Sequence, residues 1–226
     1  MAALNKNSGV TPLIALALIN RGVAKGESDD SASATADFDT VLELPQLPPG
    51  LIALAYFNRG ISKNRMNKLN NRPEEIEDYS KVISLPGAPP EFIEKALYNR
   101  GNVKKREGDT RGAIEDHSKV IDNPSASPEA IAKALQSRGG THFDLGHRGK
   151  AIEDATALIV LPGAPLKLIA DALRNRGGTK GVLGDSAGAL NDLNEALKRY
   201  TELGRKEDQD RVKQAIADFK DKFKSR

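Results

Sequence analysis

The sequence contains no cysteine, and aromatic residues make up only 4% of its 226 residues. Without cysteine, the chain can form neither disulfides nor thiolate metal sites. An apolar fraction of 38% with so few aromatic side chains indicates many small packing residues and a thin core. No apolar run approaches the roughly 18 residues that a membrane-spanning helix needs.

A strong charge bias is also lacking. Lys plus Arg exceed Asp plus Glu by three, 34 against 31, and the excess is spread along the chain, which gives no strong case for nucleic acid binding.

The apolar residues 11–19 resemble a signal-peptide core, but they lack a basic region beyond Lys6 and lead directly into a repeated pattern. We therefore expect a helix of the mature fold at this position, and a cytoplasmic protein.

Histidines are scarce as well, because His117, His142 and His147 are the only three. The last two lie five residues apart near Asp144, which is poor spacing for a metal. Residues 184–188, Gly-Asp-Ser-Ala-Gly, resemble a nucleophile motif, but they fall in a turn between predicted helices instead of a turn from strand to helix. The sequence therefore predicts no enzyme, no cofactor and no metal site.

What the sequence does contain is a repeat. A glycine recurs at spacings of 38, 41, 38 and 38 residues, with an isoleucine eight residues and an alanine five residues before it. A fixed period between about 20 and 50 residues is the signature of a repeat array. The glycines are Gly22, Gly60, Gly101, Gly139 and Gly177, the isoleucines are Ile14, Ile52, Ile93, Ile131 and Ile169, and the alanines are Ala17, Ala55, Ala96, Ala134 and Ala172.

Each repeat is predicted to hold two helices. The first begins near a proline (Pro12, Pro49, Pro90, Pro128 or Pro165), with Thr11 and Ser127 as capping residues. The second is shorter and ends at a proline-containing stretch such as 85–89 or 161–165. The three extra residues of the second repeat are placed in the turn between its helices. These limits predict one domain, 1–226, with repeats at 11–48, 49–89, 90–127, 128–164 and 165–202 and a charged capping helix at 204–224.

An arginine recurs on the apolar stripe of every first helix, directly before the repeated glycine. A buried arginine needs a partner, and an aspartate recurs at one position of every second helix. We predict that the two form structural pairs, within a repeat or bridging to its neighbour; the alternative is an arginine that extends to the solvent beside a solvated aspartate. The pairs are Arg21 with Asp37, Arg59 with Asp78, Arg100 with Asp116, Arg138 with Asp154, and Arg176 with Asp192.

The repeated pattern resembles the tetratricopeptide repeat. In the third repeat the resemblance rests on Leu97, Gly101, Gly108, Asp109, Ala113, Val120 and the nearby Pro124. It implies an all-α protein, an α-solenoid forming a right-handed superhelix of five helix pairs with a C-terminal capping helix. The sequence departs from the family in its 38-residue period, in Lys104 at a usual aromatic position, and in Glu75 where the other repeats have alanine, which predicts looser packing of the second pair.

The resemblance also implies that the first helices line a concave face on which a partner peptide lies. An apolar entrance (Leu16, Ile19, Val23, Leu54 and Ile61) followed by a basic, amide-rich centre suits an extended segment that is apolar at one end and acidic at the other. The recurring asparagines could instead form hydrogen bonds between helices. The candidate binding residues are Phe57, Asn58, Asn64, Arg65, Lys95, Tyr98, Asn99, Asn102, Lys105, Arg106, Lys133, Gln136 and Arg174, with Phe143, Asp144 and Asp171 on the same face.

The sequence therefore predicts a protein-interaction scaffold that binds a protein or peptide partner. Two alternatives remain at this point. The apolar residues Leu16 and Ile19 could serve self-assembly, as a homodimer through the N-terminal repeat, and the basic centre could bind nucleic acid or be only a solvated surface.

Overall fold

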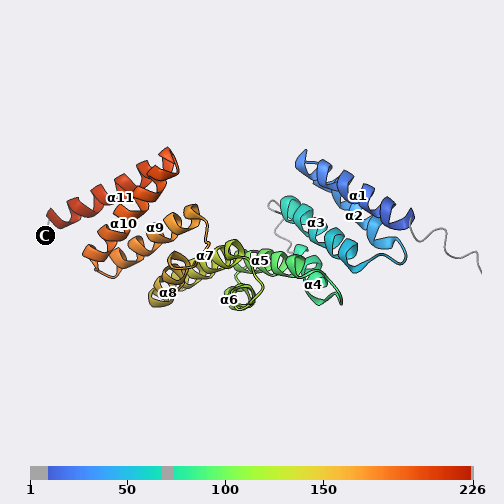
Figure 1. Ribbon diagram of the computed structural model, residues 1–226, viewed down its shortest axis with the longest axis horizontal. Coiled ribbons are helices and arrows are strands. Elements are labelled where there is room, and N and C mark those ends of the chain that lie inside the picture. Colours follow the sequence, from blue (N-terminus) through green and yellow to red (C-terminus); the bar gives the residue numbers. More distant parts are fainter. Residues whose placement is uncertain (1–9, 68–73, 225–226) are drawn as a thin grey trace, which may run out of the picture. The chain divides into compact units, whose positions relative to one another are not determined.

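The computed structural model describes residues 10–67 and 74–224, and every regular element in these ranges is an α-helix (Figure 1). None of these helices is long and apolar enough to span a bilayer. The chain divides into two compact units, residues 1–116 and 117–226, and each is described separately below. The division falls within helix α6, Thr110–Ile121.

The first unit contains consecutive helix pairs. Helix α1 lies against α2, α3 against α4, and α2 and α4 lie against the first helix of the following pair. The first helices α1 and α3, and α3 and α5, also contact each other. The bounds are α1 Val10–Glu27, α2 Ser31–Glu43, α3 Pro49–Asn67, α4 Glu75–Ser84 and α5 Pro90–Arg106. The turn in which the three extra residues of the second repeat were predicted lies outside the described residues.

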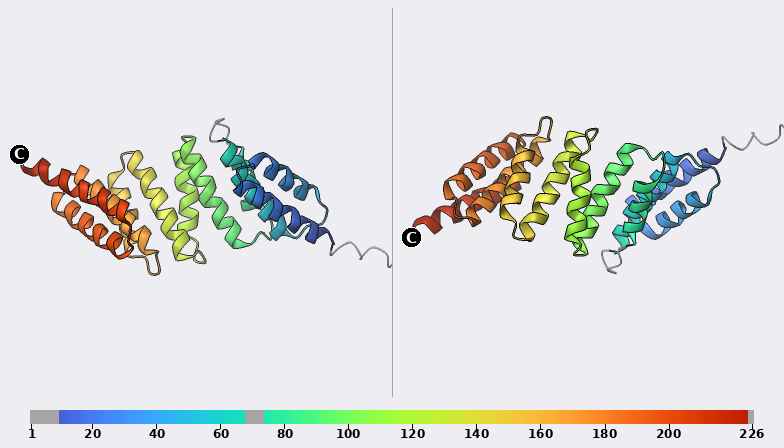
Figure 2. Two further views of the ribbon diagram at one scale, coloured as in Figure 1. Left: turned by 90° about the horizontal axis from the view of Figure 1, so that it is seen from above. Right: turned by 90° about the horizontal axis from the view of Figure 1, so that it is seen from below.

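The second unit repeats this arrangement. Helix α7 lies against α8 and α9 against α10, with further contacts of α9 to α7 and α8, and α11 covers α10 (Figure 2). The bounds are α7 Pro128–Asp144, α8 Arg148–Ile159, α9 Leu166–Val182, α10 Ser186–Glu202 and α11 Lys206–Lys224. Most second helices are shorter than the first helices, as the sequence predicts, but α10 is as long as α9, at 17 residues each.

Local sequence explains where most helices begin. Pro49, Pro90 and Pro128 occupy the first helical position, where a missing N–H leaves no bond unmade. Ser127 caps α7 by accepting a hydrogen bond from the Ala130 amide at 3.2 Å. The prediction of Thr11 as a capping residue was wrong. Helix α1 begins at Val10, so Thr11 lies inside the helix, where a proline is tolerated in the first turn.

Aspartates cap three of the second helices. The side chains of Asp30, Asp109 and Asp185 accept a hydrogen bond from the backbone amide three residues later, at 3.1, 2.8 and 2.9 Å. Asp185 therefore has a capping function inside the segment 184–188 that resembled a nucleophile motif.

The repeated glycine allows the two helices of a pair to approach closely. A Cβ atom added at Gly60 would lie 2.8 Å from the ring of Tyr79, which is fully buried in α4. Because no side chain other than hydrogen fits this gap, the glycine fixes the distance between the helices.

The core consists of small clusters, each shared by consecutive helices. In the first unit one cluster joins α1, α2 and α3, and another joins α3, α4 and α5. In the second unit one cluster joins α7, α8 and α9, and another joins α9, α10 and α11. Many of the buried residues are alanines, as the low aromatic content predicts. Each helix is therefore stabilised mainly by its immediate neighbours.

Candidate functional site

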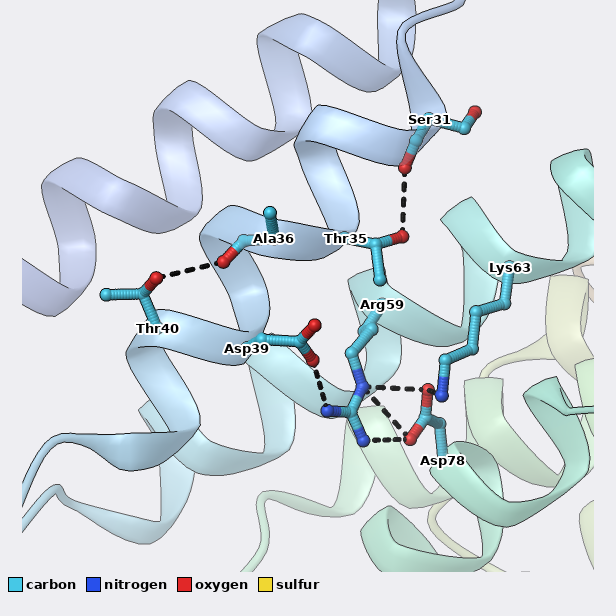
Figure 3. Close-up of polar contacts among 8 residues, drawn as sticks. All are labelled: Ser31, Thr35, Ala36, Asp39, Thr40, Arg59, Lys63 and Asp78. Atoms are coloured by element: carbon cyan, nitrogen blue, oxygen red, sulfur yellow. Dashed lines mark hydrogen bonds and ion pairs between the residues drawn. The ribbon is translucent and has the colours of Figure 1, made fainter.

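Each recurring arginine lies against the aspartate of the same helix pair. The Nε and Nη2 atoms of the arginine donate to the two carboxylate oxygens, which is the bidentate geometry that a guanidinium and a carboxylate favour (Figure 3). For Arg100 and Asp116 both distances are 2.8 Å. The structure brings together the same two groups in the other four pairs: Arg21 with Asp37, Arg59 with Asp78, Arg138 with Asp154, and Arg176 with Asp192.

The remaining nitrogen of the arginine reaches the preceding helix pair. Nη1 of Arg100 donates to the Ser80 hydroxyl at 2.8 Å, and Nη1 of Arg59 donates to Asp39 at 2.6 Å (Figure 3). In the second unit, Nη1 of Arg138 donates to Ser118, and Nη1 of Arg176 donates to Thr156. Pairing within a repeat and bridging to a neighbour were alternatives from the sequence, and these arginines do both.

Sequence reasoning missed the acceptor of this bridge, although a signal was present. Asp39, Ser80, Ser118 and Thr156 each stand two residues after the recurring aspartate of the preceding repeat. All four side chains can accept a hydrogen bond, but they are not one residue type, so the position did not stand out as a repeat.

A lysine supplies a second cation to most of the aspartates. It stands four residues after the arginine, and Lys104 Nζ lies 2.9 Å from Asp116. Lys25, Lys63 and Lys180 lie 2.9, 3.0 and 2.8 Å from the aspartates of their own pairs. Lys104, at a position where an aromatic residue is usual, therefore pairs with Asp116. In the fourth repeat His142 occupies this place, 8% exposed, and its Nδ1 has no hydrogen-bond partner among the described residues.

The cations keep the buried carboxylates ionised. Burial opposes the charged form of Asp116, but hydrogen bonds from Arg100 and Lys104 outweigh it and hold the pKa below its ordinary value. The same balance, with Arg176 and Lys180, lowers the pKa of Asp192. Burial has the opposite result at His142, where it lowers the pKa and favours the neutral ring.

The first arginine differs from the other four in its exposure. The side chain of Arg21 is 59% exposed, whereas that of Arg100 is 14% exposed. The difference arises because a preceding helix pair covers Arg59, Arg100 and Arg176 but none covers Arg21 among the described residues. Arg21 nevertheless pairs with an aspartate whose side chain is only 6% exposed, so an arginine beside a solvated aspartate, the alternative from the sequence, describes none of the five.

Two apolar candidates lie in the core. Ile19 is 1% exposed and belongs to the cluster of α1, α2 and α3, so its assignment to a binding entrance was wrong. Phe57 is half-buried, and its ring lies 6.0 Å from those of Tyr79 and Phe92. The larger part of its surface therefore stabilises the first unit.

Two of the recurring asparagines bond within the first unit. Asn58 donates to the carbonyl of Leu54, one turn earlier in α3, at 2.9 Å. Asn99 forms a hydrogen bond with the Tyr79 hydroxyl, whose pKa is raised by burial and by the Glu75 carboxylate. A hydrogen bond between helices, the alternative from the sequence, describes Asn99 of α5 with Tyr79 of α4, but not Asn58, whose bond lies within α3.

Arg106 was predicted as a groove residue, but it neutralises Glu75. The Glu75 side chain is fully buried, and its Oε1 lies 2.5 Å from Nη2 of Arg106. Nη1 of Arg106 donates to Asn64, and Nε donates to Glu107. The looser packing expected at Glu75 stays a prediction, and the structure adds that Arg106 pairs with the buried carboxylate. Arg65 is engaged as well, donating to the Gly26 carbonyl.

In the second unit a buried aspartate connects three helices. Asp171 of α9 accepts from the Tyr200 hydroxyl of α10 at 2.6 Å and from Lys167 at 2.7 Å, with Gln136 of α7 at 3.5 Å. Asp171 is 7% exposed, so its placement on an open face was wrong. Lys133 is exposed and pairs with Glu129, and Arg174 is half-buried.

One stripe of candidates on α5 is left at the surface. Lys95 is exposed, and Tyr98, Asn102 and Lys105 are half-buried, at the spacing of one helix face. The positions of the neighbouring helix α3 that correspond to Lys95, Tyr98 and Asn102 are apolar: Leu54, Phe57 and Ile61, all half-buried. We refer to these seven residues as the α3/α5 surface.

No group of three or more metal-binding side chains is found among the described residues. The ring of His142 lies 5.9 Å from that of His147, and no carboxylate joins them in such a group.

Consecutive helix pairs, with Gly22, Gly60, Gly139 and Gly177 close to the facing second helix, define an α-solenoid of five helix pairs and a capping helix in the described part of the chain. Its fold is that of the tetratricopeptide repeat proteins. The chain superimposes on the crystal structure of a tetratricopeptide repeat protein from Parabacteroides merdae with a TM-score of 0.68, at 19% identity, over 92% of this chain and 72% of that one. The complex of the yeast Sti1 TPR2AB domain with pHSP90 is matched with a TM-score of 0.40, at 14% identity, over 92% of this chain and 99% of that one. No protein-family model matches the sequence, and no curated protein does.

Proposed function

We propose that the chain is a protein-interaction scaffold whose first helices bind a segment of a partner protein. One observation carries the proposal: beyond the first repeat, the arginine and aspartate that recur in every repeat are engaged inside the molecule, whereas the stripe that differs between repeats reaches the surface. Arg100 and Asp116 illustrate the first kind, and Lys95 and Asn102 the second. A repeat protein that recognises a partner requires surface residues that can differ between repeats while the residues that hold the fold stay the same.

The α3/α5 surface defines the chemistry of the proposed partner. Its α3 side offers the exposed edges of Leu54, Phe57 and Ile61, and its α5 side offers Lys95 and Lys105 with the amide of Asn102. An extended segment with an apolar residue beside an acidic one complements both sides. The Asn102 amide can form hydrogen bonds with a peptide backbone without reading its sequence.

In the second unit, Lys133, Gln136 and Arg174 lie on first helices and belong to the same proposal. Lys133 and Gln136 have partners inside the unit, at Glu129 and Asp171. Their contribution to binding is therefore expected to be smaller than that of Lys95, because a partner would have to replace these contacts.

Selection from a displayed library of random peptides tests this function. We expect the intact protein to enrich peptides that combine apolar and acidic residues. A Lys95→Glu, Lys105→Glu variant should bind them at least about tenfold more weakly, since two attractive charges become repulsive. Arg106 is left unchanged in this variant, because its loss would leave Glu75 buried without its cation.

A Lys81→Glu, Lys119→Glu variant is the matched control. Both lysines are exposed on second helices, and the change in net charge is the same. The control should bind the selected peptides as the unchanged protein does. Equal losses in both variants would show an effect of overall charge and would exclude the α3/α5 surface as the binding site.

A further inference from the structure

We propose that one face of α1 is a docking site for an amphipathic helix of a partner protein. The face consists of Val10, Leu13, Ile14, Ala17 and Arg21, and we call it the α1 edge. These residues follow one another at i, i+3, i+4, i+7 and i+11, so they lie on one side of the helix. Leu13 is 67% exposed and Val10 is 50% exposed, which is unusual for a continuous apolar stripe.

The equivalent residues of later repeats are covered. Ala55 and Ala96, which correspond to Ala17, are fully buried, whereas Ala17 is exposed. In each case the covering residues come from the preceding second helix and the segment that follows it. The clusters contain Ile52 with Leu42 and Leu44, Ile93 with Ile83 and Leu85, and Leu168 and Ile169 with Ala155, Ile159 and Leu161.

The polar part of the α1 edge is incomplete in the same way. Nε and Nη2 of Arg21 bind Asp37, but its Nη1 donates to no acceptor in the described part of the chain. In Arg59, Arg100 and Arg176 the same nitrogen donates to Asp39, Ser80 and Thr156 of the preceding second helix. The α1 edge is therefore one half of an interface that the chain builds repeatedly within its own units.

These internal copies define the missing half. It is an amphipathic helix with a stripe of small and aliphatic residues and a Ser, Thr or Asp placed to accept a hydrogen bond from Arg21. A purely apolar ligand would cover Leu13 and Ile14 but would leave the guanidinium without an acceptor, at a cost of about 1–3 kcal/mol if that group were buried.

A second copy of this chain fits the α1 edge less well. Its second helices are covered by their own neighbours, and α10 is covered by α11. A symmetric pairing of two α1 edges would place two Arg21 guanidinium groups in one interface with no new acceptor, which electrostatic repulsion opposes. We therefore assign the site to a helix of another protein.

A peptide taken from this chain is a suitable probe. Residues 147–164 contain helix α8 with Thr156, and also Leu161 and Ala164 of the segment that packs beside α9. A cross-link between positions 149 and 153, both exposed in α8, holds the peptide helical without touching its buried side. Fluorescence anisotropy of the labelled peptide then measures its binding to the intact protein.

We expect saturable binding that a Leu13→Asp, Ile14→Asp variant weakens at least about tenfold, since two charges would enter an apolar contact. Arg21→Gln should weaken binding about fivefold, and so should Thr156→Ala in the peptide, because both remove the same hydrogen bond. Combined, the two changes should weaken binding no further than either alone. Leu145→Asp is the control, because Leu145 is an exposed leucine at the end of α7, and binding should be unchanged.

Three results would overturn the proposal. The first is no saturable binding at millimolar peptide, and the second is equal binding to the Leu13→Asp, Ile14→Asp variant, which would place the peptide elsewhere. The third is self-association of the intact protein in light scattering that the same variant abolishes, which would assign the α1 edge to a second copy. The peptide selection on the α3/α5 surface is independent of these outcomes.

Discussion

The two ends of the helical array are finished differently. At the C-terminal end, Val212 and Ile216 of α11 lie in a buried cluster with Leu193 and Tyr200 of α10. At the other end, Val10, Leu13 and Ile14 of α1 remain exposed in the described structure. Apolar residues at the C-terminal end of the array are therefore buried by a covering helix. Those of α1 form an open surface in the described structure.

The comparison also shows how the repeats are joined. An arginine between two helix pairs uses its carboxylate partner within the pair and a hydroxyl or carboxylate of the preceding one. Each pair therefore depends on the pair before it for full burial of its arginine, and the first described pair lacks this support. The predictions below test this dependence, from the largest expected effect to the smallest.

The strongest test compares a charge placed at each end. Val212→Asp should lower the free energy of unfolding by about 3–5 kcal/mol, since it buries an unpaired carboxylate in α11. Leu13→Asp should change it by less than about 0.5 kcal/mol, because the side chain already faces solvent. Urea unfolding followed by circular dichroism measures both. Similar losses at the two sites would show that the α1 edge is covered.

Removing an arginine should have a larger effect in the interior than at the edge. Arg100→Leu is expected to cost about 3 kcal/mol, because Asp116 would stay buried with Lys104 as its remaining cation. Arg21→Leu should cost under about 1 kcal/mol, as for an exposed pair. Thermal unfolding of both variants and of the unchanged protein measures the two losses of stability. A larger loss for Arg21→Leu than for Arg100→Leu would contradict the prediction.

The bridge between helix pairs is a smaller target. Ser80→Ala removes the acceptor of Arg100 Nη1 and should cost about 1 kcal/mol. Ser84→Ala is a control in the same helix, since Ser84 is exposed and bonds only to backbone carbonyls of α4, and it should cost under about 0.5 kcal/mol. If the stability losses of Ser80→Ala and Ser84→Ala differ by less than the error of urea unfolding, the hydrogen bond between Ser80 and Arg100 does not stabilise the protein.

The fourth repeat is an interior repeat with an incomplete set of cations. Because burial lowers the pKa of His142, the unfolded chain binds more protons than the folded one below about pH 6.5, so stability should fall as pH decreases through that range. His142→Lys supplies the cation that the other repeats have and should reduce this dependence. His147→Lys, at an exposed position, should leave the dependence unchanged. Urea midpoints at pH 7.5 and pH 5.5 distinguish the two variants.

Much of the fold could be predicted from the sequence because it repeats. The recurring glycine and proline positions predict helix pairs, and the structure contains them. The recurrence of Arg100 and Asp116 in equivalent positions suggested a pair that the structure brings together. Features shared by all repeats could be predicted because each repeat shows the same residue at the same position.

Features that occur once could not be predicted in the same way. Glu75 stands where the other repeats have alanine, and it is 31 residues from Arg106, so nothing in the sequence joined the two. Ile19 shares its position with Phe57 and Tyr98, yet it is 1% exposed within the cluster of α1, α2 and α3, whereas the other two are half-buried.

A double-mutant cycle on Arg100 and Asp116 tests the central claim most directly, when it is compared with the same cycle on Arg21 and Asp37. The account predicts a coupling energy of about 2 kcal/mol for the interior pair and under about 1 kcal/mol for the pair at the α1 edge. Equal coupling at the two sites, or coupling near zero between Arg100 and Asp116, would contradict it.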